Sequence, residues 1–137
     1  HIKFDLYGLD NKQPIWSDDY KLALSQSKMA LNLSQGKPSK YYSSDRIAQL
    51  VANGILTFVD KETKLSKIFK NDEVVFYNSS NDLTKKINFY LNKTKLRNKI
   101  AKKGKEKYLK HLNSSKVASY IVKKTLNIKD KEKFIWE

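Results

Sequence analysis

The stretch SSDRIAQLVANGILTFVD, residues 43–60, decides the predicted fold. Ser43 and Ser44 are favourable helix N-caps, and the apolar residues that follow recur at helical spacing. Asn53-Gly54 ends the helix, because glycine readily takes the left-handed conformation found just past helix ends. The short apolar run over 55–59 then predicts a strand that is covered on both faces.

The helix start at Ser43 and Ser44 is a candidate phosphate site. Free backbone N–H groups and the helix dipole both favour an anion there. Arg46 lies in the first turn, and only Arg46 and Arg97 are arginines in a chain with 28 Lys and Arg residues. Arginine offers a planar, two-pronged donor that lysine lacks. A phosphate contact and a surface ion pair are both open for Arg46.

Length and composition indicate one domain with a real core, because 39% of the 137 residues are hydrophobic. The chain has no cysteine, and no apolar run approaches the roughly 20 residues of a membrane span. No signal peptide is recognisable, so we expect a cytoplasmic protein. Because the chain starts at His1 and its one Met is Met29, we expect a piece of a longer protein.

The net charge of +14 is compatible with nucleic acid, an anionic membrane surface or a phosphate-bearing ligand. The excess is nearly all lysine, in a chain that is also rich in Asn and Ile. An A/T-rich genome produces that combination without selection for binding. The lysines over 95–110 are therefore expected to form a solvated helix face, and any DNA binding there to be weak and salt-dependent.

Strand-like and helix-like segments alternate, which predicts an α/β fold with a parallel sheet of about four strands and a helical C-terminal third. The strands are expected at 2–7, 29–33, 55–59 and 73–77. Helices are expected at 17–27, 45–53, 63–69, 80–91, 94–110 and 114–126. Ligands of such sheets bind at the carboxyl ends of the strands. The loops at 8–10, 32–42, 60–63 and 77–80 should therefore share one edge.

Two further features concern packing. Gly104 interrupts a helical pattern and marks a bend or a close contact. The apolar residues Phe134, Ile135 and Trp136 near the C-terminus are expected to pack on this domain or on another part of the protein.

The chain resembles the spore-maturation CgeB-like glycosyltransferases, in the GT-B class with two Rossmann-like domains. The resemblance rests on landmarks in order along nearly the whole chain: SKMALNLS (27–34), RIAQLVANGILTFVD (46–60), Phe69 with Glu73, Asp82-Leu83, and RNKIAKKG (97–104) followed by His111. The resemblance implies that residues 1–137 are a single, partial C-terminal domain. Such a domain binds a nucleotide-diphosphate sugar donor for hexosyl transfer to an unknown acceptor.

The loops of the carboxyl edge and the landmarks together give the candidate donor-binding residues: Gly8, Asn32, Ser43, Ser44, Arg46, Gln49 and Glu73. Catalytic groups cannot be assigned, because the acceptor site of this family lies largely in another domain. No cofactor is expected. Neither a His cluster nor closely paired carboxylates indicate a metal site.

Gln49 departs from the family pattern, in which a glutamate three residues after the arginine holds the ribose hydroxyls of the donor. Glutamine is a neutral and weaker acceptor. Glu73 has two readings, a contact to a sugar hydroxyl or a plain surface position at a strand start. His111 is expected to be structural, with a catalytic role as the alternative.

The leading hypothesis is a sugar-nucleotide domain, in which the helix start and Arg46 stabilise charge on a diphosphate leaving group. Two alternatives stay open. A Lys-rich nucleic-acid-binding module would explain the charge, although no binding motif is present. A non-catalytic docking domain of the same fold would explain Gln49.

Overall fold

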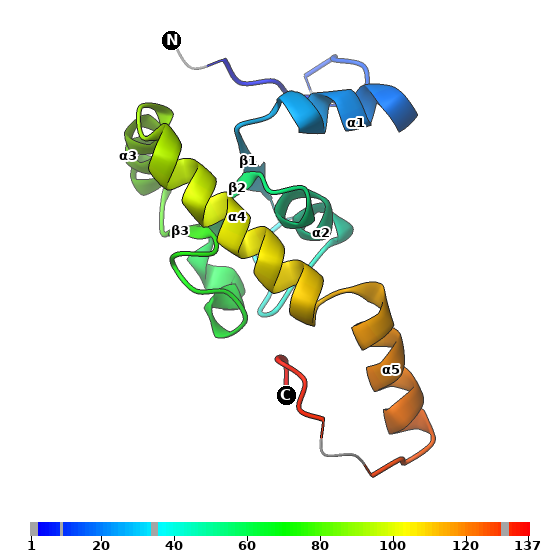
Figure 1. The fold of residues 1–137 in the computed structure, drawn as a ribbon. Helices are drawn as coiled ribbons and strands as arrows, with labels where there is room; N and C mark the ends of the chain where they lie inside the picture. Colours follow the sequence, from blue (N-terminus) through cyan, green and yellow to red (C-terminus); the bar gives the residue numbers. More distant parts are fainter. Residues whose placement is uncertain (1–2, 9, 34–35, 130–131) are drawn as a thin grey trace.

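Three short parallel strands form the sheet, within a structure that describes residues 3–8, 10–33, 36–129 and 132–137 (Figure 1). In this computed structural model β1 (Met29–Asn32) and β3 (Val75–Tyr77) flank β2 (Leu56–Asp60). Both pairings are parallel. The expected parallel pairing of the segments 55–59 and 73–77 is therefore confirmed.

Helices cover both faces of this sheet. On one face α2 (Asp45–Ala52) buries Ile47 and Val51 in a cluster with Val59 of β2. On the other face α3 (Ser80–Leu91) packs Leu83 and Ile87 against a cluster that contains Phe58 of β2. Neighbouring residues of β2 point to opposite faces, because side chains alternate along a strand. The result is a Rossmann-like α/β layer, as expected.

The long helix α4 (Thr94–His111) contributes to both clusters. Ile100 is buried on the α3 side of the sheet, whereas Tyr108 packs on the α2 side. Gly104 lies between them, and a Cβ atom there would be 2.3 Å from the carbonyl oxygen of Glu73. Gly104 therefore marks a close contact of α4 with the backbone that leads into β3. Most α4 lysines are exposed, as expected.

The C-terminal segment 132–137 packs on α5 (Ser114–Thr125) through an aromatic cluster. The ring of Tyr120 lies 5.0 Å from that of Phe134 and 5.5 Å from that of Trp136, both edge-on. Of the two expectations for these apolar residues, packing on this domain is the correct one. No helix in the described ranges has the length and apolarity that crossing a membrane would require.

The expected strand at 2–7 is wrong in its described part, because residues 3–7 have no strand structure. Residue 2 lies outside the described residues. Phe4 is 55% exposed and Tyr7 is 49% exposed, so the described residues leave about half of each of these two side chains uncovered. Figure 1 shows the segment running as coil toward α1 (Ser17–Gln26). An alternating pattern forms a strand only where a neighbouring strand and a covering layer are available.

The expected helix at 63–69 is also wrong. Two 3₁₀ turns replace it, η1 (Lys61–Thr63) and η2 (Leu65–Lys67). Lys64 between them has a left-handed backbone with φ of +57°, which an α-helix cannot include. Leu65 is nonetheless fully buried against the α2 side of the sheet. The apolar residues of this segment therefore predicted burial correctly, but not the type of helix.

Candidate functional site

The first turn of α2 lies at the carboxyl end of β1, where sequence reasoning placed it. Ser44 is the N-cap with extended backbone, but its hydroxyl makes no capping hydrogen bond. That hydroxyl is buried and has no hydrogen-bond partner within the described ranges. A buried hydroxyl without a partner is uncommon in folded proteins. The helix start therefore retains hydrogen-bonding capacity that no described group of the protein uses.

Asn32 is the last residue of β1 and is only 1% exposed. Neither its amide nitrogen nor its amide oxygen has a hydrogen-bond partner within the described part of the chain. An unpaired buried amide costs on the order of 1–3 kcal/mol of stability. The chain therefore keeps a costly polar group at the carboxyl edge of the sheet.

Arg46 joins the start of α2 to the end of β1. Its Nη1 donates a hydrogen bond of 2.5 Å to the carbonyl oxygen of Leu33, the residue that follows Asn32. The side chain is exposed and makes no ion pair with a described carboxylate. The surface ion pair that was the alternative for Arg46 is therefore absent from the described residues. This hydrogen bond holds the guanidinium at the carboxyl end of β1.

Gln49 lies one turn further along α2 and is engaged at both ends of its amide. The hydroxyl of Tyr20 in α1 donates to Gln49 Oε1. Gln49 Nε2 donates to Asp45 Oδ2 at 2.5 Å. Burial raises the pKa of Tyr20, and the nearby Asp45 carboxylate raises it further. Gln49 is thus part of a Tyr-Gln-Asp hydrogen-bond chain that holds α1 against α2.

Glu73 does not share the edge of Asn32 and Arg46. It precedes β3 and so lies at the amino end of the sheet, where its side chain is only 13% exposed. Glu73 Oε2 accepts a hydrogen bond from the backbone N–H of Lys70 at 2.8 Å, and the ammonium of Lys107 lies 3.8 Å from Oε1. Through these two contacts Glu73 links the segment before β3 to α4.

Gly8 is not at the sheet edge either, because the strand expected before it does not form. It has a φ of +71° beside Pro14, which fits the expected turn.

His111 is half-buried at the end of α4. Burial lowers its pKa, and the positive charges of Lys107, Lys110 and Lys116 lower it further. Both effects favour the neutral form of the imidazole.

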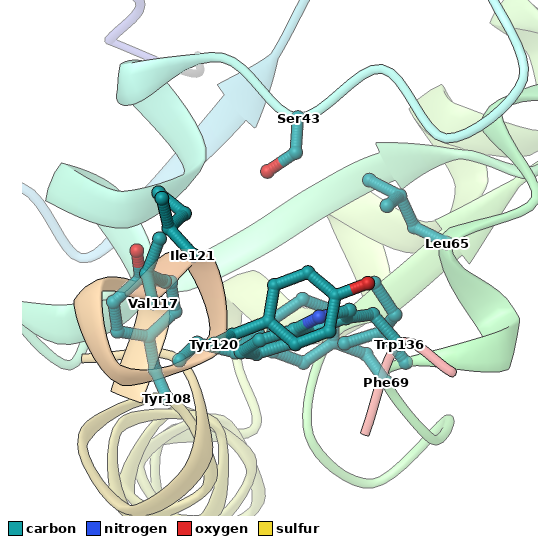
Figure 2. A pocket seen from close by; sticks show the side chains of 10 residues that line it. Ser43, Leu65, Phe69, Tyr108, Val117, Tyr120, Ile121 and Trp136 are labelled. Carbon is teal, nitrogen blue, oxygen red and sulfur yellow. The ribbon is translucent and has the colours of Figure 1, made fainter. Parts of the chain in front are cut away.

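A cavity of about 410 Å³ lies next to Ser43, one residue before the α2 N-cap. Figure 2 shows the Ser43 hydroxyl above the rings of Tyr120 and Trp136, with Leu65 and Ile121 on either side. The lining comes from the α2 entry, the η2 region, α4, α5 and the C-terminal segment: Ser43, Leu65, Ile68, Phe69, Tyr108, Leu112, Val117, Tyr120, Ile121 and Trp136. Sequence reasoning missed this cavity, although the apolar residues near the C-terminus were a signal for part of its wall.

Comparisons with known proteins give one family. A family model described as glycosyl transferase-like matches residues 1–123 of the chain. No curated protein and no solved structure gives a significant match to it.

Proposed function

The chain belongs to the glycosyl transferase-like family, and from this premise we propose that the carboxyl edge around β1 and α2 binds a nucleotide-diphosphate sugar. The observation that carries the proposal is the unpaired, buried amide of Asn32 beside the Arg46 anchor. A ligand with several hydrogen-bonding groups would supply the missing partners. The three-strand parallel sheet is consistent with a partial GT-B domain of Rossmann-like fold. A CgeB-like specificity and a cytoplasmic location stay predictions.

Each group at this edge suits one part of the donor. The diphosphate would lie at the α2 start, near its first backbone N–H groups and the exposed side chains of Ser43 and Arg46. Asn32 would hydrogen-bond the sugar or the nucleoside, because its amide can both donate and accept. The diphosphate gains negative charge as the glycosidic bond breaks, and the helix dipole and guanidinium would stabilise that charge. The acceptor would be bound mainly by another domain.

Arg46→Lys is expected to weaken UDP or GDP binding by roughly 1–3 kcal/mol, the range for hydrogen bonds to charged groups. Lysine keeps the charge but loses the planar fork. Folding stability should change by less than about 0.5 kcal/mol, because the side chain is exposed. Isothermal titration calorimetry with both nucleotides measures the affinity, and Lys85→Arg on exposed α3 surface is the control. Equal affinities of wild type and Arg46→Lys would remove Arg46 from the site.

Asn32→Val is expected to raise the melting temperature of the free protein and to abolish the shift that a nucleotide sugar produces. Valine removes the unpaired amide and favours a strand. A ligand that binds only the folded state raises the melting temperature, so thermal unfolding with and without UDP- and GDP-sugars reads both effects. Thr57→Val is the matched control on β2, because Thr57 is equally buried but its hydroxyl donates to Ile55 O at 2.9 Å. A destabilised Asn32→Val variant with an intact ligand shift would show Asn32 to be structural.

The second candidate function is a non-catalytic docking domain of the same fold. The Gln49 amide favours it, because Tyr20 and Asp45 already engage both of its ends. The thermal-unfolding experiment separates the two functions, since a docking domain gives no shift with any nucleotide sugar. A nucleic-acid-binding module has the net charge of +14 as its support, and salt-dependent DNA binding without a nucleotide-sugar shift would favour it.

A further inference from the structure

We propose that the cavity beside Ser43 binds a small, uncharged, apolar molecule that carries one hydroxyl group, in the class of aryl alcohols. The cavity shares Ser43 with the proposed diphosphate site, but neither Asn32 nor Arg46 lines it, so benzyl alcohol binding and nucleotide binding can be measured separately. It concerns the space shown in Figure 2, between α2, η2, α4, α5 and the C-terminal segment.

The walls of the cavity favour an apolar ligand. Aliphatic side chains enter from three directions, with Leu65 and Ile68 from the η2 region, Leu112 from the end of α4, and Val117 and Ile121 from α5. None of the described residues that line the cavity is charged. The cavity is partly open to solvent, because Val117 and Ile121 of its α5 wall are 40% and 56% exposed, and a ligand that covers these side chains gains from apolar burial. The volume here, about 410 Å³, accommodates a substituted aromatic ring.

The aromatic walls favour a ring over a flexible chain. Tyr120 and Trp136 stand nearly perpendicular, at an interplanar angle of 87°, and both line the cavity. Edge-on contacts of this kind are preferred between aromatic rings. The segment that carries Trp136 is held on α5, where the ammonium of Lys124 lies 2.8 Å from Glu137 Oε1. Trp136 therefore forms an aromatic wall of the cavity, with which a ligand ring can make the same edge-on contact.

Ser43 provides the place for a hydroxyl. Its oxygen is turned toward the cavity in Figure 2, between Leu65 and Ile121. The hydroxyl makes no hydrogen bond to another described residue, so it can both donate to and accept from a ligand. It is the one aliphatic hydroxyl among the described lining residues. A single hydroxyl on the ligand matches this arrangement.

Trp136 also gives a direct readout of binding. The chain has two tryptophans, and Trp16 is 74% exposed, so Trp16→Phe leaves Trp136 as the emitter. Benzyl alcohol is the probe, and toluene is the matched probe without the hydroxyl. We expect benzyl alcohol to change the Trp136 emission saturably and to raise the melting temperature. Toluene should bind about three- to tenfold more weakly, as expected for one lost hydrogen bond. Ser43→Ala should remove this difference between the two probes.

Val117→Phe fills the cavity and is expected to weaken benzyl alcohol binding at least tenfold. Val122→Phe is the control, because Val122 lies on the same helix, is 51% exposed and does not line the cavity. Circular dichroism verifies folding, and Ile121→Phe replaces Val117→Phe if the latter unfolds. The proposal is overturned if emission changes without saturation, or if the filled and control variants bind equally. Equal binding of both probes, unaffected by Ser43→Ala, would overturn the role of the hydroxyl.

Discussion

Gly104→Ala is expected to destabilise the protein by about 3 kcal/mol, which corresponds to a fall in melting temperature of roughly 10 °C. The added Cβ would lie 2.3 Å from the carbonyl oxygen of Glu73 and 3.4 Å from Cγ1 of Val51. The first neighbour is backbone, so it cannot move aside as a flexible side chain does. α4 and the backbone before β3 would have to separate, and the clusters on both faces of the sheet would lose contact with α4.

The sign of this effect separates the close contact from helix propensity. In an open helix interior, glycine to alanine is expected to stabilise by about 1 kcal/mol. Lys99→Ala, at an exposed position of the same helix, controls for changes in helix propensity and should shift stability by less than about 0.5 kcal/mol. Urea unfolding followed by circular dichroism measures all three proteins. A Gly104→Ala variant as stable as wild type would mean that α4 does not approach Glu73 this closely.

Arg97→Ala is expected to cost about 3 kcal/mol, because it removes the donor that closes the end of α3. The Arg97 side chain is buried, with the residue 6% exposed. Its Nη1 donates to the carbonyl oxygens of Tyr90 at 3.0 Å and Leu91 at 3.2 Å, and its Nη2 to Thr94 Oγ1 at 3.4 Å. These carbonyls belong to the last turn of α3, where helix carbonyls lack intrahelical partners. Alanine removes the side-chain donor of the Leu91 carbonyl, while Tyr90 O keeps the backbone N–H of Lys93 at 3.3 Å, and it leaves a cavity.

Arg97→Lys separates the contribution of the positive charge from that of the planar guanidinium with its several N–H donors. A lysine at this position keeps the charge but cannot span acceptors on both sides of the turn between α3 and α4, so about half of the loss should remain. Lys95→Ala, exposed in the first turn of α4, is the control and should change little. Guanidinium chloride unfolding gives the free energies. Full retention of stability in Arg97→Ala would show that solvent satisfies these carbonyls instead.

The two arginines, Arg46 and Arg97, have different roles in the structure. Their rarity among lysines predicted positions that need a planar fork, and for Arg97 the fork is structural, bridging backbone carbonyls. Arg46 uses one nitrogen in the same way, on Leu33 O, but its side chain is exposed at the carboxyl edge of the sheet. Residue type therefore indicated the chemistry of both positions. Burial, which depends on the whole fold, distinguishes the structural fork from the candidate binding group.

The sequence by itself determined the elements whose signals are local. The periodic apolar residues over 45–52, the left-handed Gly54 and the apolar run before Asp60 specify helix, turn and strand through neighbouring residues, and all three are present. The order of these elements was enough to predict a parallel sheet, because parallel strands need crossover connections. The strand expected at 2–7 failed because its pattern is local, whereas pairing needs a distant partner.

Only the tertiary structure decided which polar groups are satisfied. Gln49 meets Tyr20, which is 29 residues away, and Glu73 meets Lys107 at the edge opposite to Asn32. Asn32 itself ends a strand with its amide unpaired. No local pattern encodes these outcomes, because hydrogen bonding of a buried side chain depends on what the rest of the chain brings within about 3 Å. The predicted elements therefore located the edge of the candidate site, and long-range packing selected the side chains available there.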